Sequence, residues 1–321
     1  MKKIFLGLCL ALLSIPAIAQ AQSTDFNNWL AGFKQEAAQK GVSYNTINAA
    51  TAGITPIQRV IDLDRKQPEW KKTFVDYKKM IVNPTRVTKG RQLLQDHALA
   101  LNEVEQKYGV PKEVIVALWG IETNYGSNTG GFNVVQSLAT LAWEGRRAEF
   151  FKKELINALK IIDQGHVRAD SMKGSWAGAL GQNQFMPSSF HSYAVDHNGD
   201  GKRDIWGTKI DVFASSANYL KSNGWRAGER WGRRVNVPSN FAQSLVKNKT
   251  KKSVNEWSRM GVRAYGGGSL PASDMMGRIV MPDGAGGEAY LVYKNYDVIM
   301  RWNRSTYFAT SVGLLMDKLG Q

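Results

Sequence analysis

The stretch PKEVIVALWGIETNYG, residues 111–126, contains a strongly apolar helical pattern and a single central acid, Glu122. Pro111 suits a first helical turn, because its missing N–H has no helical partner there, and the next residues are apolar on nearly every side. The pattern therefore predicts a buried helix. Glu122 falls three, four and seven residues after apolar side chains, so its carboxylate extends the same stripe: Trp119, Leu118 and Ile115.

A carboxyl on an apolar stripe has two interpretations. Burial disfavours the ionised form and raises the pKa, which is the condition that a general acid needs near neutral pH. The alternative is a structural Glu122 at a helix end, paired with a Lys or Arg side chain. This stretch alone leaves both interpretations open.

The first 21 residues have the pattern of a secretory signal peptide. Met1, Lys2 and Lys3 are followed by an apolar run and then by small residues at the cleavage position. Cys9 is the only cysteine and lies inside that run, so the mature chain is predicted to have no disulfide and no thiol chemistry. Lipoprotein anchoring through Cys9 is disfavoured, because Leu8 stands where a small residue should precede the cysteine.

The remaining chain is long and basic. Of 321 residues 43% are hydrophobic, which supports a substantial core, and no later stretch approaches the roughly 20 apolar residues of a membrane span. Removing Lys2 and Lys3 lowers the formal charge from +15 to +13. Such a charge favours polyanions: cell-wall polymers, anionic lipid surfaces or nucleic acid. No nucleic-acid module is visible, and the basic run at residues 247–252 is interpreted as a solvated loop.

Helical periodicity dominates the chain, with one interruption by short β-like runs. A Gly- and Ala-rich stretch at residues 174–187 allows close approach of backbone to backbone or to ligand, or else tight helix packing. The β-like runs lie within residues 228–288 and predict a small antiparallel subdomain. Helices are predicted at residues 25–107 (ending in an amphipathic run at 86–108), 133–141, 146–164, 212–222 and 297–319.

A loop with the spacing of a calcium site begins at Asp196. Oxygen side chains stand at loop positions one, three, five and nine, glycine stands at six, and Lys202 would contribute its backbone carbonyl. Position twelve departs from the pattern, because Gly207 replaces the expected glutamate; Asp211 is the natural substitute in a longer loop. The alternative is a polar turn without metal. A bound ion would be structural, since saturated oxygen coordination leaves no position for substrate.

Five motifs together resemble the lytic murein transglycosylase B family, over residues 27–321: LWGIETNYG (118–126), EGRRAEFF (144–151), GSWAGALGQNQFMPSSF (174–190), AVDHNGDGKRDIW (194–206) and RWNRSTYFA (301–309). The resemblance implies a mainly α (α+β) protein: a lysozyme-like α core with an EF-hand-like loop, a flanking α domain and the small β subdomain. The expected boundaries are 22–106 for the α domain, 107–227 with 295–321 for the core, and 228–294 for the β subdomain.

The resemblance also implies an activity and its residues. The family cleaves the β-1,4 bond between N-acetylmuramic acid (MurNAc) and N-acetylglucosamine (GlcNAc) in peptidoglycan, in the periplasm, with structural calcium, no organic cofactor and possible partners among other cell-wall enzymes. Glu122 matches the catalytic glutamate. Positions that line the glycan groove or support the acid are Tyr77, Arg146, Arg147, Ser175, Gln184, Tyr219, Trp302, Asn303 and Phe308. The calcium ligands are Asp196, Asn198, Asp200, Lys202, Asp204 and Asp211.

Trp302 and Phe308 stand where the family leads us to expect tyrosines. Trp302 can stack on a sugar, whereas Phe308 lacks the hydroxyl and any hydrogen bond that it made. No second acid has an evident place beside Glu122, because Glu144 and Glu149 are expected to pair locally. A single carboxyl acting as acid and then base would give a 1,6-anhydro sugar. The alternatives are a hydrolytic muramidase and a non-catalytic cell-wall binding module.

Overall fold

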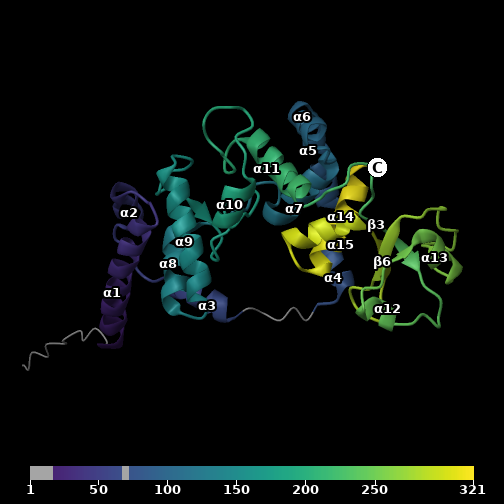
Figure 1. Cartoon of the computed structure of the whole chain (residues 1–321), viewed down its shortest axis with the longest axis horizontal. Helices are drawn as coiled ribbons and strands as arrows, with labels where there is room; N and C mark the ends of the chain where they lie inside the picture. The colour runs from purple at the N-terminus through teal and green to yellow at the C-terminus, as the bar shows by residue number, and fades with distance from the viewer. Residues whose placement is uncertain (1–16, 67–71) are drawn as a thin grey trace, which may run out of the picture.

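The computed structural model describes residues 17–66 and 72–321, with side chains from residue 25 onward. The predicted signal peptide, including Cys9, lies outside the described side chains. The described chain forms an elongated row of packed helices with a small sheet at one end (Figure 1). In these residues, no helix combines the length and apolar character needed to cross a bilayer.

Helices supply most of the structure. The long α7 (Lys112–Thr123), α8 (Val134–Glu144), α9 (Ala148–Asp163) and α11 (Lys209–Ser222) confirm four predicted helices. The remaining helices of the N-terminal half and the central loop region are α1 (Ala17–Gln39), α2 (Tyr44–Thr51), α3 (Gln58–Arg65), α4 (Phe74–Ile81), α5 (Pro84–Asp96), α6 (Ala98–Tyr108) and α10 (Pro187–Tyr193).

Two predicted helices are each broken into two. The run at residues 86–108 divides into α5 and α6 at His97, whose ring packs against the rings of Trp119 at 5.8 Å and Phe213 at 5.4 Å. The run at residues 297–319 divides into α14 (Lys294–Trp302) and α15 (Thr306–Leu319), because the Ser305 side chain accepts from the backbone of the new first turn. Core contacts and a capping residue thus override periodicity.

The predicted antiparallel β subdomain is confirmed as a five-stranded sheet with the order β4-β6-β7-β3-β5. Its central strands pair Val235 with Ala289, and Ile279 with Leu291. Trp257 is fully buried in a separate hydrophobic cluster beneath the sheet. The elements are β3 (Gly232–Asn236), α12 (Ser244–Lys247), β4 (Lys252–Ser253), α13 (Val254–Arg259), β5 (Arg263–Ala264), β6 (Met276–Val280) and β7 (Ala289–Val292).

The Gly- and Ala-rich stretch at residues 174–187 is a folded-back loop, and it also packs tightly on a helix, because a Cβ added at Gly178 would lie 2.4 Å from Cδ2 of Leu138 in α8. It follows β2 (Lys173–Gly174), which pairs with β1 (Phe132–Asn133), and single bridges join Leu180 to its neighbours. A Cβ added at Gly174 would lie 2.1 Å from the carbonyl oxygen of Ala179. The glycine therefore permits the backbone-to-backbone approach that the sequence predicted.

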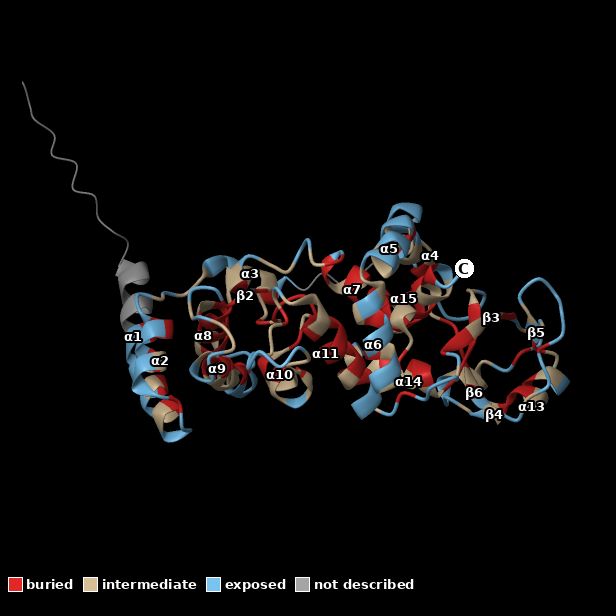
Figure 2. Cartoon of the chain, turned by 90° about the horizontal axis from the view of Figure 1, so that it is seen from above, coloured by how far each residue is buried: buried red, intermediate tan, exposed pale blue. Residues whose placement is uncertain are grey.

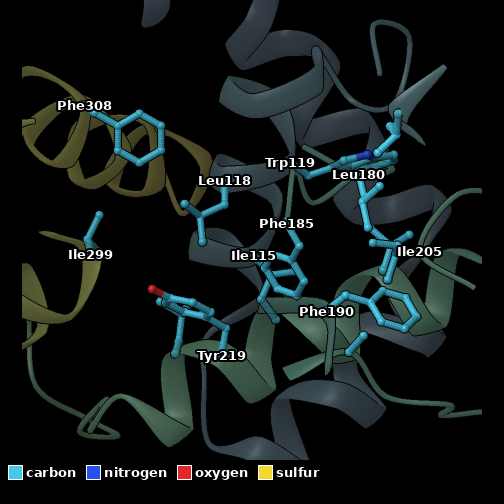
Figure 3. Packing of buried hydrophobic residues seen from close by; sticks show 14 of the residues in the cluster. Ile115, Leu118, Trp119, Leu180, Phe185, Phe190, Ile205, Tyr219, Ile299 and Phe308 are labelled. Atoms are coloured by element: carbon cyan, nitrogen blue, oxygen red, sulfur yellow. The ribbon is translucent and has the colours of Figure 1, made fainter. Parts of the chain in front are cut away.

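Helix α7 lies at the centre of the larger hydrophobic cluster, as predicted. Its residues from Val114 to Gly120 are buried, and α5, α6, α11 and α15 all contact it (Figure 2). Figure 3 shows Ile115, Leu118 and Trp119 among buried side chains from the Gly-rich loop, α11, α14 and α15. Because helices from both halves of the sequence cover α7, its C-terminal end is held from several sides.

Candidate active site

Glu122 lies in the last turn of α7, where the backbone is fixed by left-handed residues. Asn124 (φ 49°) and Tyr125 (φ 62°) end the helix. The Tyr125 hydroxyl donates to the carbonyl oxygen of Arg86 at 2.7 Å, and the Thr123 hydroxyl donates to that of Gln182 at 3.1 Å. These bonds hold the turn carrying Glu122 against α5 and the Gly-rich loop.

The carboxyl of Glu122 is half-buried and bound by an indole. Trp302 Nε1 donates to Glu122 Oε1 at 2.8 Å, and no Lys or Arg within the described chain forms an ion pair with Glu122. The alternative of a structural ion pair is therefore wrong for these residues. Burial raises the pKa of Glu122 to about 7, although the hydrogen bond from Trp302 opposes the rise.

Aromatic side chains gather around this acid. Burial raises the pKa of Tyr77 on α4, and the negative charge of Glu122 raises it further. The Trp302 ring packs against Tyr219 at 4.7 Å and Phe185 at 5.2 Å. The Tyr219 hydroxyl donates to the carbonyl oxygen of Arg301 at 2.8 Å. Aromatic faces beside a polar group are typical of sugar-binding sites.

Ser175 and Gln184 shape the Gly-rich loop. Ser175 Oγ accepts from the Ala179 backbone at 3.0 Å. Gln184, at φ 50°, donates its side-chain amide to the carbonyl oxygens of Gly181 at 2.9 Å and Thr129 at 3.1 Å. These contacts place both residues in the loop that packs on the end of α7.

Two buried amides of the same loop were missed from the sequence. Gln182 Oε1 accepts from Trp119 Nε1 at 2.9 Å, and Asn183 donates to the carbonyl oxygen of Val212 and to Ser216 Oγ, both at 2.7 Å. They join the Gly-rich loop to α7 and α11. The available signal was their position directly after Gly181 in a run of three amides, GQNQ, within an otherwise apolar stretch, since buried amides need hydrogen-bond partners.

Phe308 and Asn303 lie outside the aromatic group formed by Tyr77, Tyr219 and Trp302. Phe308 is buried, 5% exposed, and packs in the core of α15 (Figure 3). Asn303 is exposed, and its side-chain oxygen accepts from the Ser305 backbone at 3.1 Å. The structure thus brings Tyr77, Tyr219 and Trp302 towards Glu122 and leaves Phe308 in the core.

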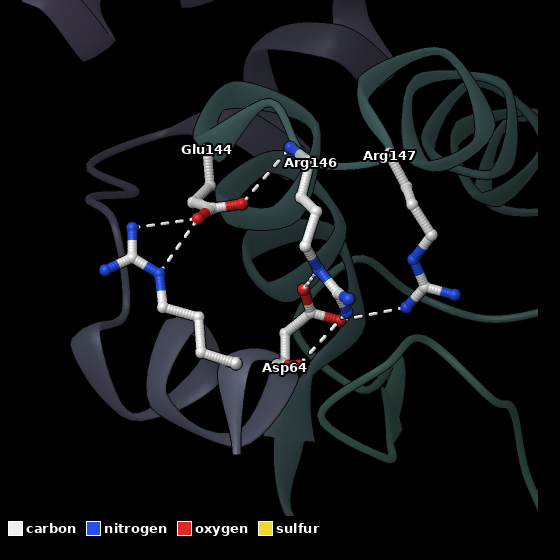
Figure 4. A network of polar contacts seen from close by, with 5 residues as sticks. Asp64, Glu144, Arg146 and Arg147 are labelled. Carbon is white, nitrogen blue, oxygen red and sulfur yellow. Dashed lines mark hydrogen bonds and ion pairs between the residues drawn. The ribbon is translucent and has the colours of Figure 1, made fainter. Parts of the chain in front are cut away.

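Arg146 and Arg147 bind a buried carboxylate on α3 (Figure 4). Arg146 Nε lies 2.7 Å and Arg147 Nη2 2.9 Å from the Asp64 carboxylate, whose pKa is lowered chiefly by the Arg146 hydrogen bond. Glu144 pairs with Arg65 at 2.9 Å, and Glu149 with Lys152 at 3.0 Å. The prediction of local pairing is confirmed for Glu149, whose partner lies one turn away in α9, and is wrong for the ion pair of Glu144, whose partner Arg65 lies on α3.

The loop that begins at Asp196 turns several oxygens inward. Asp196 accepts from the Gly199, Asp200 and Gly201 backbones, and the fully buried Asp211 accepts from those of His197 and Asp204. Burial raises the pKa of Asp211, and the negative charge of Asp196 adds to the rise. Carboxylate oxygens in a turning loop are the donors that a hard cation such as calcium prefers.

Asp204 differs from the other predicted ligands. Its two oxygens accept from the Trp206, Gly207 and Thr208 backbones and from the Thr208 hydroxyl, at the entry to α11. Asn198 and Asp200 contact each other at 3.1 Å, and the Lys202 backbone donates to Asp200. Across the described residues, no three or more His, Cys, Asp or Glu side chains converge as a ready metal site.

The helical core around α7, the small sheet and the half-buried acid define a lysozyme-like α+β protein. The transglycosylase SLT domain family matches residues 25–317. The chain belongs to this family.

Three relatives illustrate the likeness. Membrane-bound lytic murein transglycosylase B of Escherichia coli (strain K12) is 34% identical over 245 residues, which cover 74% of this chain and 65% of that protein. SltB3 from Pseudomonas aeruginosa, solved in complex with NAG-anhNAM-pentapeptide, is 45% identical with a TM-score of 0.89, covering 92% of this chain and 79% of its own. Slt35 from E. coli, solved in complex with calcium, is 30% identical with a TM-score of 0.77, covering 91% and 92%.

Proposed function

We propose that this chain is a peptidoglycan lytic transglycosylase that cleaves the MurNAc-β-1,4-GlcNAc bond and leaves 1,6-anhydro-MurNAc ends. The observation that carries the proposal is Glu122, an acid with a pKa of about 7 that is bound by an indole instead of a cation. The ligand of SltB3 contains an anhydro sugar and a pentapeptide, which supports peptide-bearing glycan as the substrate.

Glu122 performs both proton transfers. Its protonated carboxyl gives the proton to the glycosidic oxygen, the bond from C1 to that oxygen breaks, and the MurNAc N-acetyl oxygen bonds to C1 and stabilises the positive charge. The carboxylate then takes the proton of the C6 hydroxyl, whose oxygen attacks C1 and displaces the acetamido oxygen. No water is consumed, and Glu122 ends protonated as it began.

A hydrolytic muramidase is the enzymatic alternative. Hydrolysis normally uses a second carboxylate beside the acid, and Glu144 and Glu149 are bound elsewhere by Arg65 and Lys152. Mass analysis of digested sacculi separates the outcomes, because the anhydro product is one water lighter than the hydrolytic one. Binding of sacculi without any release would support a non-catalytic wall-binding protein instead.

The activity is expected to fall as pH rises through about 7. The first step needs protonated Glu122, so kcat/KM should be level below the pKa and decline about tenfold per pH unit above it. Initial rates of anhydro-muropeptide release between pH 5 and 9 measure this profile. A profile that rises through pH 7 would contradict an acid of this pKa.

Trp302→Phe provides a matched test of the same assignment. The variant keeps an aromatic ring but removes the N–H that binds Glu122 Oε1, and this hydrogen bond lowers the pKa. The alkaline limb of the pH profile should therefore move to higher pH. An unchanged limb would show that the indole does not act on the acid.

We further propose that Tyr77, Tyr219 and Trp302 contact the glycan, with Ser175, Gln184 and Asn303 on the loops beside them. Arg146 and Arg147 would act by holding α3 against the junction of α8 and α9. We propose that the signal peptide exports the chain to the periplasm, where its wall substrate lies. We also keep the division into an α domain, a core and a β subdomain as a proposal. Other cell-wall enzymes are possible partners.

We propose structural calcium in the loop from Asp196 to Asp211, held by Asp196, Asn198, Asp200, the Lys202 carbonyl and Asp211, with Asp204 capping α11. Calcium at about 100 times its dissociation constant should raise the free energy of unfolding by about 2.7 kcal/mol. Thermal unfolding with calcium and with chelator measures the difference. Asp200→Asn should reduce the stabilisation by calcium. The control Asp76→Asn, outside the loop, should be stabilised by calcium as much as wild type is. The absence of any stabilisation by calcium in wild type would contradict the proposal.

A further inference from the structure

Helix α4, which carries Tyr77, is held in place by the β subdomain. The helix has 8 residues, and tertiary contacts decide where so short a helix lies, because it is not stable alone. It packs on α15 at the end of the helical row that faces the sheet (Figure 1). The loop between β6 and β7, residues 281–288, contacts this helix through two carboxylates, Asp283 and Glu288.

Asp283 accepts two hydrogen bonds on one oxygen. The Phe74 N–H donates to Asp283 Oδ1 at 2.6 Å, and the Tyr307 hydroxyl donates to the same atom at 2.7 Å. Phe74 is the first residue of α4, so its N–H has no acceptor inside the helix. Tyr307 lies in the first turn of α15. One carboxylate of the β subdomain therefore joins the start of α4 to the start of α15.

A second contact, one turn further along α4, fixes the rotation of the helix about its axis. Lys78 Nζ lies 2.5 Å from Glu288 Oε1, and both side chains are mostly buried. The Phe74 ring is fully buried and packs edge-on against that of Tyr290 at 6.0 Å. Phe74 and Lys78 are four positions apart, so they share the face of α4 that contacts the sheet. Tyr77, three positions after Phe74, lies beside this face.

The Tyr307 ring lies next to Tyr77. The two ring centroids are 5.7 Å apart with 54° between the ring planes, and the Tyr307 ring is also 5.4 Å from that of Phe74. The hydrogen bond to Asp283, and then burial, raises the pKa of Tyr307, so its hydroxyl remains a donor at neutral pH. Because this hydroxyl is bound at one end, the ring has little freedom and limits where the Tyr77 ring can lie.

We propose that Asp283 and Tyr307 are positioning residues that hold the Tyr77 ring in the glycan-binding site. The inference rests on the proposed function, in which Tyr77 contacts the sugar. It also gives the β subdomain a role, since one carboxylate of its β6–β7 loop sets an aromatic wall of a site built in the helical core. Without an acceptor at position 283 the Phe74 N–H is left unpaired, and α4 must shift to regain a partner.

The test is a double-mutant cycle on glycan binding. Calorimetry on the full mature chain measures the affinity for the tetrasaccharide GlcNAc-MurNAc-GlcNAc-MurNAc in a Glu122→Gln background, which stops the proposed reaction during the titration. Asp283→Ala is compared with and without Tyr77→Ala, because a residue that acts only through Tyr77 has no effect once that ring is absent. Mass analysis of the titrated mixture reports any cleavage, so a failure of the proposed function is seen separately.

Three further variants complete the cycle. Asp283→Asn keeps an acceptor oxygen for both donors. Tyr307→Phe removes only the hydroxyl and provides a second test if Asp283→Ala does not fold. Asp274→Ala is the matched control, since this exposed carboxylate of the same subdomain accepts from Asn255 and, in the described structure, receives no bond from α4 or α15.

Asp283→Ala should weaken binding roughly tenfold when Tyr77 is present and less than about twofold when it is replaced. Tyr307→Phe should show a smaller loss, about threefold, with the same dependence on Tyr77. Asp283→Asn and the control Asp274→Ala should bind within about twofold of the parent protein. Unchanged binding in both Asp283→Ala and Tyr307→Phe, an equal loss with and without Tyr77, or an equal loss in the control would overturn the proposal.

Discussion

Glu122→Gln should reduce the release of anhydro-muropeptides from sacculi at least a thousandfold. Each positioned proton transfer contributes about 10²–10⁴-fold, and one carboxyl is proposed to make two of them. The amide can still accept from Trp302, so the geometry of the site is retained. Product release is measured by chromatography and mass spectrometry, and glycan binding by sedimentation with sacculi, which the variant should retain.

Glu149→Gln is the matched control for this substitution. Its side chain is 85% exposed and pairs only with Lys152 and solvent in the described structure. Its activity should equal that of wild type. An active Glu122→Gln enzyme would contradict the assignment of Glu122 as the sole acid and base. Equal losses of activity in both variants would indicate a general effect of removing an acidic charge.

Glu122→Gln should also be more stable than wild type at alkaline pH. The pKa of Glu122 is raised on folding from its ordinary value of 4.5 to about 7, so ionisation destabilises the folded state as pH rises through this window. At 1.36 kcal/mol per pH unit, the cost reaches about 3 kcal/mol above pH 7, and neutral Gln avoids it. Urea unfolding at pH 4 and pH 8 measures the free energy of unfolding of Glu122→Gln and of wild type. If the variant's gain in stability were smaller at pH 8 than at pH 4, a raised pKa of Glu122 would be contradicted.

Gly313→Ala should lower the free energy of unfolding by about 3 kcal/mol. Gly313 lies in α15 against the buried indole of Trp231, and an added Cβ would fall 2.2 Å from a ring carbon. The indole is 1% exposed and rigid, so α15 or the ring must shift. Urea unfolding followed by circular dichroism measures the loss.

Gly32→Ala in α1 provides a control of opposite sign. An added Cβ there meets nothing within 4 Å, so only helix propensity changes and stability should rise by about 0.5–1 kcal/mol. Equal effects at the two glycines would show that propensity alone governs both positions. The comparison separates the conformational cost of glycine from the space that it leaves for Trp231.

Local signals predicted the central part of the fold and the acid. Pro111, the apolar run and Glu122 lie within a few turns of one helix, so their spacing alone predicts a buried helix that carries an acid. The β subdomain was also predictable, because alternation and glycine turns mark each strand locally. The breaks at His97 and Ser305 were missed because ring packing and a cap override periodicity there.

Relations between distant segments could not be predicted from spacing. Trp302 and Glu122 are 180 positions apart, and nothing local indicates that an indole expected to stack on sugar donates to the acid. The basic run at residues 247–252 looks solvated in sequence, because its concave surroundings come from α11 and α14. Phe308, expected at the groove, lies in the core because α15 presents its apolar face inward.

The contact between Trp302 and Glu122 imposes an order in time. The ribosome makes the acid long before it makes the indole, and α15, which packs on α7, follows later still. A chain that stopped before Trp302 would carry the acid on a helix contacted by α5, α6 and α11 but without the indole and without α15. The acid therefore gains its indole partner only after some 180 further residues have been made.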